Sequence, residues 1–574
     1  MMSAAGRVTT EQHAAPYRQR LHQPGPVPEK RDDYTSRLMA ALYAIIFVTG
    51  GATLALELLA SRVMTPYFGV SLYIWTGILS ITLVALALGY WAGGRAAAIL
   101  AADNRSERLY SMFLLMPALS ALALVGACLM YPHVFPLLAG EDLVAGSFIA
   151  CVILLGVPLV TTSAMNPLLI AIRVRQAAAR VHADAGAGRV FFVSTVGSVA
   201  GVVVTAFGLI PRFSNFVSLL IVALCLSLLP MLALLPASQR PAGRRGLLAT
   251  SAVAIVAAAA LLWRADAYLG RMWPVKYSGL DWTIEARESS LFGTVKILRS
   301  SPIDERGRFV RVYFQDGLMQ NRMLSDGESF SFYTYALEAL ALSHRPDMRT
   351  ALVLGLGAGV VPRRLSERGV EVTAVEIDPA SFTVSRRFFG LDRTKVKAIQ
   401  EDARTYLRTC NGGYDAIVAD LFHGDGTPDY LITRNFFADL RACLAPRGVV
   451  VFNTFADLDL PIGYAHFLAT LRTEFPYVTL YRENDPGARH VNSYVVASVA
   501  VPAPIPVELR NIPGRYGEQL AALLRSPRQL DPGLLAGGLV ITDARSGGAV
   551  DLARAQMGYR RQVARDLPPA FLVN

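Results

Sequence analysis

The sequence predicts a multi-span α-helical membrane domain followed by a small β-domain and a Rossmann-like α/β domain with a doubly wound sheet. Three observations support this fold class: a long apolar stretch, a short region of alternating apolar residues, and a later alternation of strand and helix patterns around a glycine-rich turn. The chain of 574 residues is too long for one domain and, with 53% hydrophobic and 17% charged residues, too apolar to be wholly soluble. The expected regions are a flexible tail (1–37), a membrane domain (38–263), a linker with a small antiparallel β-domain (264–345), a Rossmann-like α/β domain (346–500) and a C-terminal extension (501–574).

Seven apolar runs make up the expected membrane domain. Most are long enough to cross a hydrocarbon core of about 30 Å at about 1.5 Å per residue. Gly197 and Gly201 have the small-residue spacing that allows close helix packing. The runs cover residues 38–60, 72–94, 109–131, 144–172, 190–211, 216–236 and 247–263, and the last run is the shortest.

The arginines favour one orientation of these spans. With the N-terminus inside, the arginines of 95–108, 173–189 and 240–245 lie on the cytoplasmic side, as the positive-inside rule requires. Seven crossings would carry the C-terminal half outside, where adenosine cofactors are not normally supplied. We therefore interpret 247–263 as a surface or re-entrant helix, and expect a multi-pass protein of the bacterial inner membrane with a cytoplasmic catalytic domain.

Composition argues against two classes of site. The net charge of +11 is concentrated in the tail and in short loops between apolar runs, which fits a membrane protein better than a nucleic-acid-binding one. The five cysteines form no CxxC pair, and three of them lie in apolar runs. We therefore expect neither a disulfide framework nor a metal site.

A glycine turn and an acid on the next strand indicate a nucleoside site. Gly355, Gly357 and Gly359 follow an apolar strand, and glycine lets the backbone bend tightly and approach a ligand. Glu376 ends the next strand, where a carboxylate accepts hydrogen bonds from ribose hydroxyls. The alternatives are a structural glycine turn and a solvated acid. Asp378, followed by a proline, fits a helix cap.

Two further acids follow the later strands. Asp402, with Ala403 after it, lies where an acid binds an adenine amino group, and its alternative is another helix cap. Asp420 ends an apolar strand that begins at Tyr414. Open α/β sheets bind ligands at the carboxyl ends of their strands, so Asp420 is the expected catalytic group.

These motifs together resemble the spermidine synthase family of polyamine aminopropyltransferases over roughly residues 282–500. The segments 355–359, 375–378, 402–403 and 414–420 resemble its nucleoside-binding and catalytic motifs, and 288–293 and 315–320 resemble its small β-domain. The apolar half is similar to the span region of membrane-fused bacterial members at 47–51, 57–62, 87–89 and 197–201.

The resemblance implies a role for each matching residue. Glu376 would hold ribose, Asp402 adenine, and Gln320 the nucleoside or the acceptor, while Asp420 would take a proton from the attacking amine. His423, Asp425 and Tyr335 are further acceptor-side candidates. The donor would be decarboxylated S-adenosylmethionine, with no metal.

Three positions depart from the family pattern. Ala358 stands where an acid usually pairs with the donor amine, Gly293 replaces a glutamine, and His423 replaces a second acid. Intact S-adenosylmethionine is therefore an alternative donor.

Glu57 lies within an apolar run, where an ionisable group costs about 3 kcal/mol unless it is paired. Substrate binding and an ion pair with Arg62 are the two explanations for it.

The sequence leaves three candidate functions: an aminopropyltransferase acting on an amine, a methyl or aminocarboxypropyl transferase acting on a lipid or membrane-held acceptor, and a transporter or sensor with a regulatory adenosine-binding domain. The expected partners are the acceptor and the bilayer, not nucleic acid, with a homo-oligomer left open.

Overall fold

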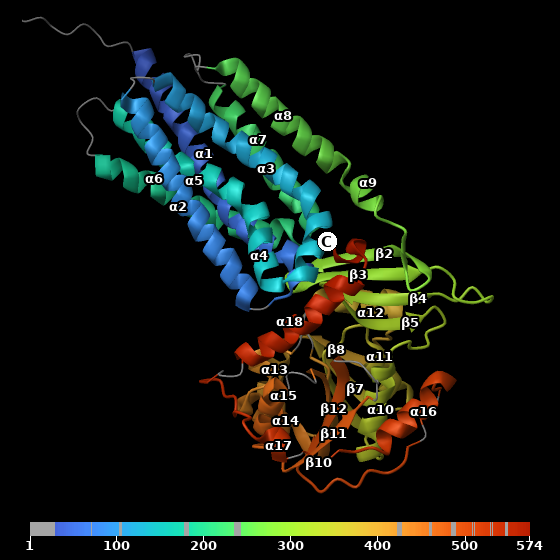
Figure 1. Ribbon diagram of the computed structural model, residues 1–574. Coiled ribbons are helices and arrows are strands. Elements are labelled where there is room, and N and C mark those ends of the chain that lie inside the picture. The colour runs from blue at the N-terminus through green and yellow to red at the C-terminus, as the bar shows by residue number, and fades with distance from the viewer. Residues whose placement is uncertain are drawn as a thin grey trace, which may run out of the picture.

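The computed structural model has a helical bundle at one end, a five-stranded sheet beneath it and an α/β domain beyond the sheet (Figure 1). It describes residues 29–70, 72–102, 106–176, 183–234, 243–421, 427–457, 462–483, 490–507, 509, 511–528, 530, 532–545 and 549–573.

Seven helical segments of the described chain are long and apolar enough to cross a membrane, as the apolar runs predict. The π-helical turn η1 (Val152–Gly156) joins α4 to α5 within the fourth segment, and a second one, η2 (Thr205–Leu209), ends the fifth segment. The helices are α1 (Glu29–Phe68), α2 (Leu72–Ala102), α3 (Ser106–Glu141), α4 (Leu143–Cys151), α5 (Val157–Gln176), α6 (Ala183–Val204), α7 (Asn215–Leu234) and α8 (Arg244–Trp263), and a short α9 (Ala265–Gly270) follows.

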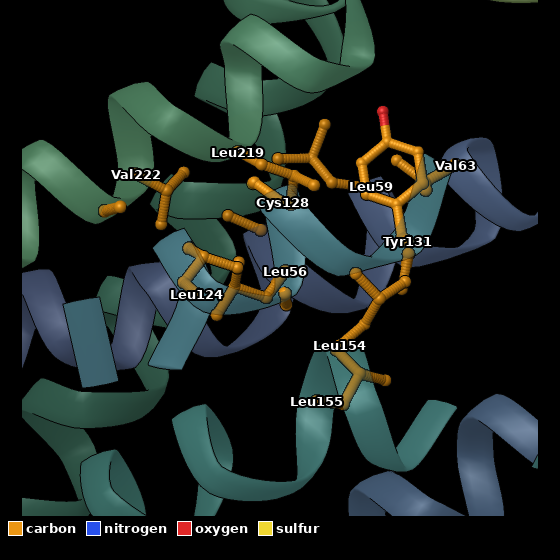
Figure 2. Close-up of a cluster of buried hydrophobic side chains, with 14 of the residues drawn as sticks. Leu56, Leu59, Val63, Leu124, Cys128, Tyr131, Leu154, Leu155, Leu219 and Val222 are labelled. Carbon is orange, nitrogen blue, oxygen red and sulfur yellow. The ribbon is translucent and has the colours of Figure 1, made fainter. Parts of the chain in front are cut away.

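Large apolar side chains fill the centre of the bundle. Figure 2 shows Leu59 of α1, Leu124 and Tyr131 of α3, Leu154 of η1 and Leu219 of α7 in one cluster. On the opposite face of α1, small residues allow close contact with α6. A β-carbon on Gly197 would lie 2.0 Å from the carbonyl oxygen of Phe47, so the predicted glycine packing is present.

The structure contradicts the interpretation of 247–263 as a surface or re-entrant helix. Helix α8 is 20 residues long and packs along α3 and α7. Its buried residues recur at helical spacing along almost the whole length, so one face of α8 is part of the bundle. These residues are Leu247, Ser251, Ala254 and Ala258.

The small sheet joins the bundle to the α/β domain. All of its pairs are antiparallel, and Asp316 and Gly317 make the tight turn between the last two strands with φ of 46° and 89°. One face, with Leu298, belongs to the same apolar core as the bundle, whereas the other face, with Ile297, packs toward α12. The strands are β1 (Val275–Tyr277), β2 (Leu280–Ser290), β3 (Gly293–Ser300), β4 (Val310–Gln315) and β5 (Leu318–Leu324).

The α/β domain is built on a seven-stranded sheet in the order β11-β12-β10-β9-β6-β7-β8. Strands β6 to β10 are parallel to one another. Strand β12 runs antiparallel to β10, and the edge strand β11 runs antiparallel to β12. The strands are β6 (Thr350–Leu354), β7 (Glu371–Glu376), β8 (Val396–Gln400), β9 (Tyr414–Ala419), β10 (Leu444–Asp457), β11 (Tyr477–Arg482) and β12 (His490–Ser498).

Helices cover both faces of this sheet, as expected for a doubly wound fold. The order reverses at β6, which lies between β7 and β9. The helices are α10 (Phe332–His344), α11 (Val360–Glu367), α12 (Pro379–Phe389), α13 (Ala403–Thr409), η3 (Asp429–Leu431), α14 (Arg434–Cys443), α15 (Ile462–Leu471), α16 (Gly514–Leu524) and α17 (Pro532–Leu535).

The C-terminal segment returns to the bundle. Helix α18 (Ala549–Asp566) packs on α3 and α1, and α19 (Pro569–Leu572) packs on α3 (Figure 1). The ring of Phe571 stacks on Trp273 at 5.5 Å, and the buried ammonium of Lys296 donates to the carbonyl groups of Phe571 and Val573. Sequence patterns assigned no role to this segment, which here joins the bundle, the small sheet and the α/β domain.

Candidate active site

A cavity of about 390 Å³ opens at the carboxyl ends of β6, β7 and β9, where the strand order reverses. This is the position at which open α/β sheets bind ligands. The cavity brings together eight of the residues predicted from the sequence: Gly355, Gly357, Gly359, Glu376, Asp402, Ala403, Asp420 and Gln320.

The glycine turn forms one wall. Gly355 has φ of 91°, and a β-carbon there would lie 2.2 Å from the carbonyl oxygen of Asp420. Only glycine therefore fits between the ends of β6 and β9 without displacing one of them. Gly357 has φ of 50° and nothing within 4 Å of its β-carbon position, which leaves its backbone open toward the cavity.

Glu376 supports this turn from the end of β7. Its carboxylate accepts hydrogen bonds from the backbone N–H groups of Leu356 (2.9 Å), Gly357 (3.3 Å) and Asp378 (2.9 Å). Burial raises the pKa of Glu376, while these three donors oppose the rise. The carboxylate is thus held at the rim of the cavity.

Asp378 and Asp402 both cap helices. Asp378 accepts from the Ala380 N–H at 2.9 Å, which confirms the predicted cap of α12. Asp402 accepts from the Thr405 N–H at 2.9 Å and so also has its alternative role, a cap on α13. The other carboxylate oxygen of Asp402 accepts from the Tyr430 hydroxyl at 3.1 Å. The Asp402 side chain therefore caps a helix and also lines the cavity.

Asp420 is half-buried at the end of β9, with its carboxylate held by Asn453 of β10. The Asn453 side-chain amide donates to Asp420 Oδ1 at 2.8 Å. Burial raises the pKa of Asp420 to about 6; the Asn453 hydrogen bond opposes the rise and the charge of Glu376 adds to it. A carboxylate with this pKa accepts and releases a proton close to neutral pH.

A second cavity of about 420 Å³ meets the first one at four residues, Gln320, Asn321, Tyr333 and Asp420. Its remaining wall includes an acid, two amides and hydroxyl groups from separate parts of the chain. These are Glu483, Asn453, Asn492, Ser331 and Tyr559, the last from α18. Asp420 therefore lies at the junction of the two cavities.

A β-bulge directs Gln320 toward this junction. Asn321 pairs with Tyr313 and Met319 pairs with Phe314, so Gln320 is the extra residue of β5. Gln320 lines both cavities. The motif that suggested Gln320 therefore coincides with a local break in the ladder.

Tyr335 lies elsewhere, and Tyr333 takes the expected place. Tyr335 is fully buried, donates to the Ser329 carbonyl at 3.1 Å and lies under the Arg364 guanidinium. Tyr333, two residues earlier on α10, accepts from the Asn321 amide at 2.9 Å. Residues two apart face different sides of a helix, so only one of them reaches the site.

The other predicted residues do not join this site. Glu57 lies within α1 and lines neither cavity, and no ion pair in the described part of the chain joins it to Arg62. Arg62 instead donates to the Ser290 carbonyl in the small sheet. His423 and Asp425 lie outside the described residues. The described residues also contain no group of three or more His, Cys, Asp or Glu side chains placed to hold a metal ion.

Gly293 and Ala358, two of the positions that depart from the family pattern, lie in different surroundings. A β-carbon on Gly293 would lie 2.1 Å from a carboxylate oxygen of Asp316, whose other oxygen accepts from the Thr294 N–H at 3.0 Å. Asp316 thus excludes a larger residue at 293. Ala358 lines the first cavity and adds no charge to it.

The family model that matches this chain is the spermine/spermidine synthase domain, over residues 330–462. These residues form a spermine/spermidine synthase domain. They contain Asp420, Glu376, Asp402 and the glycine turn, whereas Gln320 lies just before them.

Two curated relatives match parts of the chain. The chain is 36% identical over 138 residues to an N-terminal histidine N-methyltransferase of Emericella nidulans, and this match covers 23% of the chain and 24% of the relative. It is 34% identical over 151 residues to a polyamine aminopropyltransferase of Vibrio vulnificus, which covers 25% of this chain and 50% of the relative. The chain thus spans half or less of the length of these curated relatives. A crystal structure of spermidine synthase from Thermotoga maritima aligns with a TM-score of 0.34 at 19% identity, covering 44% of this chain and 87% of that one.

Proposed function

We propose that this protein is a membrane-bound aminopropyltransferase that moves an aminopropyl group from decarboxylated S-adenosylmethionine to an amine. The single observation that carries the proposal is the place of Asp420, at the junction of two cavities. One cavity has the glycine turn and the acids suited to a nucleoside, and the other has the polar groups suited to an amine.

The proposed reaction is a displacement at a carbon already activated by positive sulfur. The acceptor nitrogen attacks the methylene group next to the sulfonium, a C–N bond forms, and the C–S bond breaks to leave methylthioadenosine. The new ammonium group then loses a proton to Asp420. The protein contributes alignment of the two reactants and a carboxylate base.

The residues on the donor side have separate tasks. The N–H groups near Gly357 and the carboxylate of Glu376 face the ribose region, and Asp402 with Tyr430 faces the adenine region. On the acceptor side, Asp420 and Glu483 place two carboxylates in the wall of the second cavity, which attract an ammonium group. Arg322 lines the same cavity with the opposite charge.

Ala358 supports a second candidate, in which intact S-adenosylmethionine is the donor. An acid at this position would repel the carboxylate of intact S-adenosylmethionine, and alanine removes that repulsion. The group transferred would then be methyl or aminocarboxypropyl. Its acceptor would be a lipid or a membrane-held amine.

Product analysis separates these candidates. The full-length protein in detergent is given an amine with either decarboxylated or intact S-adenosylmethionine, and nucleosides are identified by mass spectrometry. Methylthioadenosine formed only from the decarboxylated donor supports the proposal. Methylthioadenosine from the intact donor indicates aminocarboxypropyl transfer, and S-adenosylhomocysteine indicates methyl transfer. No nucleoside product from either donor supports a transporter or sensor.

A further inference from the structure

Arginines gather at one end of the helical bundle. There Arg173 donates to the Tyr43 hydroxyl and, at 3.4 Å, to the Gly186 carbonyl, which joins α5 to α1 and α6. The Arg173 and Arg189 guanidinium groups lie 5.5 and 4.9 Å from the centre of the Tyr43 ring. Since the spans alternate in direction, the arginines at this end whose side chains the structure describes include Arg37, Arg95, Arg108, Arg173, Arg175, Arg189, Arg244 and Arg245.

The catalytic half is attached to the opposite end (Figure 1). The Arg560 guanidinium donates to the carbonyl groups of Pro66 (3.1 Å) and Asp316 (2.8 Å), which ties the end of α1 to the small sheet. Arg561 and Arg565 donate to the Gly140 carbonyl near the end of α3. The contacts therefore lie at the end of α1 and α3 that is remote from the arginine cluster.

That end of the bundle has little net positive charge of its own. Arg62 donates to the Ser290 carbonyl, and Arg212 donates to carbonyl groups of η2. Arg264 and Arg271 follow α8 and α9 at this end, and the acids there are Glu141, Asp142 and Asp266. Short loops rich in arginine stay in the cytoplasm during membrane insertion. With α8 packed along the bundle as a seventh span, this rule places the catalytic half on the other side of the membrane.

The cysteines provide an independent observation. Cys410 and Cys443, at the ends of α13 and α14, form a disulfide with 5.8 Å between their α-carbons. The three remaining cysteines of the chain, Cys128, Cys151 and Cys225, are free and lie within the spans. Disulfides persist in oxidising compartments such as the periplasm and are rare in the cytosol.

We infer that the catalytic half lies on the non-cytoplasmic face of the membrane, with Cys410 and Cys443 joined as a disulfide. This replaces the cytoplasmic placement expected from the sequence. If the proposed function is correct, this placement also assigns the substrates to a compartment. The amine acceptor must then be one that is present outside the cytosol. Because adenosine donors are made from cytosolic ATP, a transport step must bring the sulfonium nucleoside across the membrane before the reaction.

Thiol labelling tests the orientation without any need for turnover. Arg306→Cys places a thiol in an exposed turn of the small sheet, and Glu107→Cys places one at the exposed start of α3, by the arginine cluster. The glutamate is chosen because acids contribute little to orientation. A maleimide that does not cross the inner membrane should label Arg306→Cys and spare Glu107→Cys in intact cells. The reverse pattern overturns the inference.

Thiol counting tests the disulfide on the unmodified chain. Of the five cysteines two are paired, so denatured protein should take up three polyethylene glycol maleimides without reductant and five after reduction. Five without reductant would refute the disulfide and remove its support for the placement. Neither measurement uses a substrate, so a failed enzyme assay leaves this inference standing, and a reversed orientation leaves the proposed chemistry standing.

Discussion

Replacing Asp420 with asparagine should abolish turnover while preserving the shape of the site. The Asn453 amide donates to Asp420 Oδ1, and the oxygen of a carboxamide accepts the same hydrogen bond. The carboxamide has no capacity to take the ammonium proton. Loss of a general base lowers kcat by about 100-fold or more, so kcat should fall by at least this factor with nucleoside affinity within about threefold of the parent.

The same change should make the folded protein more stable at neutral pH. Burial raises the pKa of Asp420 from 3.8 to about 6, so the folded state favours the protonated form. As pH rises through this window the unfolded chain loses its proton first, and the ionised carboxylate costs the folded state up to about 3 kcal/mol above pH 6. Asparagine is never ionised, so the stability gain should be present at pH 7 and absent at pH 4.

Asp415, at the other end of β9, is a matched control because its pKa is lowered, whereas the pKa of Asp420 is raised. Burial alone would raise the pKa of Asp415, but the N–H groups of Arg349 and Thr350 and the ion pair with Arg345 lower it. Its contribution to stability is therefore present at neutral pH and lost as pH falls. Asp415→Asn should lower stability at pH 7 and leave the chemical step intact.

Three measurements on each variant decide the matter: kcat by methylthioadenosine release, nucleoside affinity by calorimetry, and thermal stability at pH 4 and pH 7. If Asp420→Asn loses nucleoside binding together with turnover, or becomes less stable at pH 7, the carboxylate is a structural group and the argument for a base fails. The parent enzyme adds a pH test. With a pKa of about 6 in the free protein, kcat/KM should fall about tenfold between pH 7 and pH 5 as Asp420 becomes protonated.

Three other substitutions test separate parts of the structure. Gly355→Ala should weaken nucleoside binding far more than Gly357→Ala. A β-carbon at residue 355 would lie 2.2 Å from the Asp420 carbonyl oxygen, whereas a β-carbon at residue 357 would have nothing within 4 Å. Equal affinities of the two variants in calorimetry would contradict the close approach at Gly355. Tyr333→Phe should raise the KM for the acceptor about fivefold by removing a hydroxyl group from the junction, and an unchanged KM would place the acceptor elsewhere. Phe571→Ala should cost about 3–5 kcal/mol and make α18 sensitive to protease, since the ring is fully buried; an unchanged melting temperature would show that the C-terminal segment does not hold the parts together.

Local patterns predict much of the site because its chemistry lies at strand ends. Gly355, Glu376 and Asp420 each lie at the end of an apolar run. This pattern predicts both the strand and the edge of the sheet at which its last residue lies. The Asp-Gly pair at 316–317 in the same way predicts a hairpin turn. In each case the residues that decide the structure are neighbours in sequence.

Features that depend on distant contacts were missed. Asn453 lies inside β10 rather than at a recognisable motif, and its importance comes from the neighbouring strand that carries Asp420. Tyr333 and Tyr335 are equally plausible in sequence, and the packing of α10 on α11 decides between them. The apolar run 247–263 is short and rich in alanine, so the packing of α8 in the bundle could be recognised only from the neighbours that accept its small residues.

The close contact at Gly317 explains how the bundle and the active site act as one unit. A β-carbon on Gly317 would lie 2.2 Å from the carbonyl oxygen of Pro66 in α1 and 2.5 Å from the Arg560 guanidinium, so the turn presses directly on the end of a span. Gln320 follows three residues later and enters both cavities from its bulge. A shift of α1 along its own axis toward the small sheet would therefore press on this turn, three residues from Gln320. One apolar core contains the bundle and a face of the small sheet, so separating the two would expose that core to water.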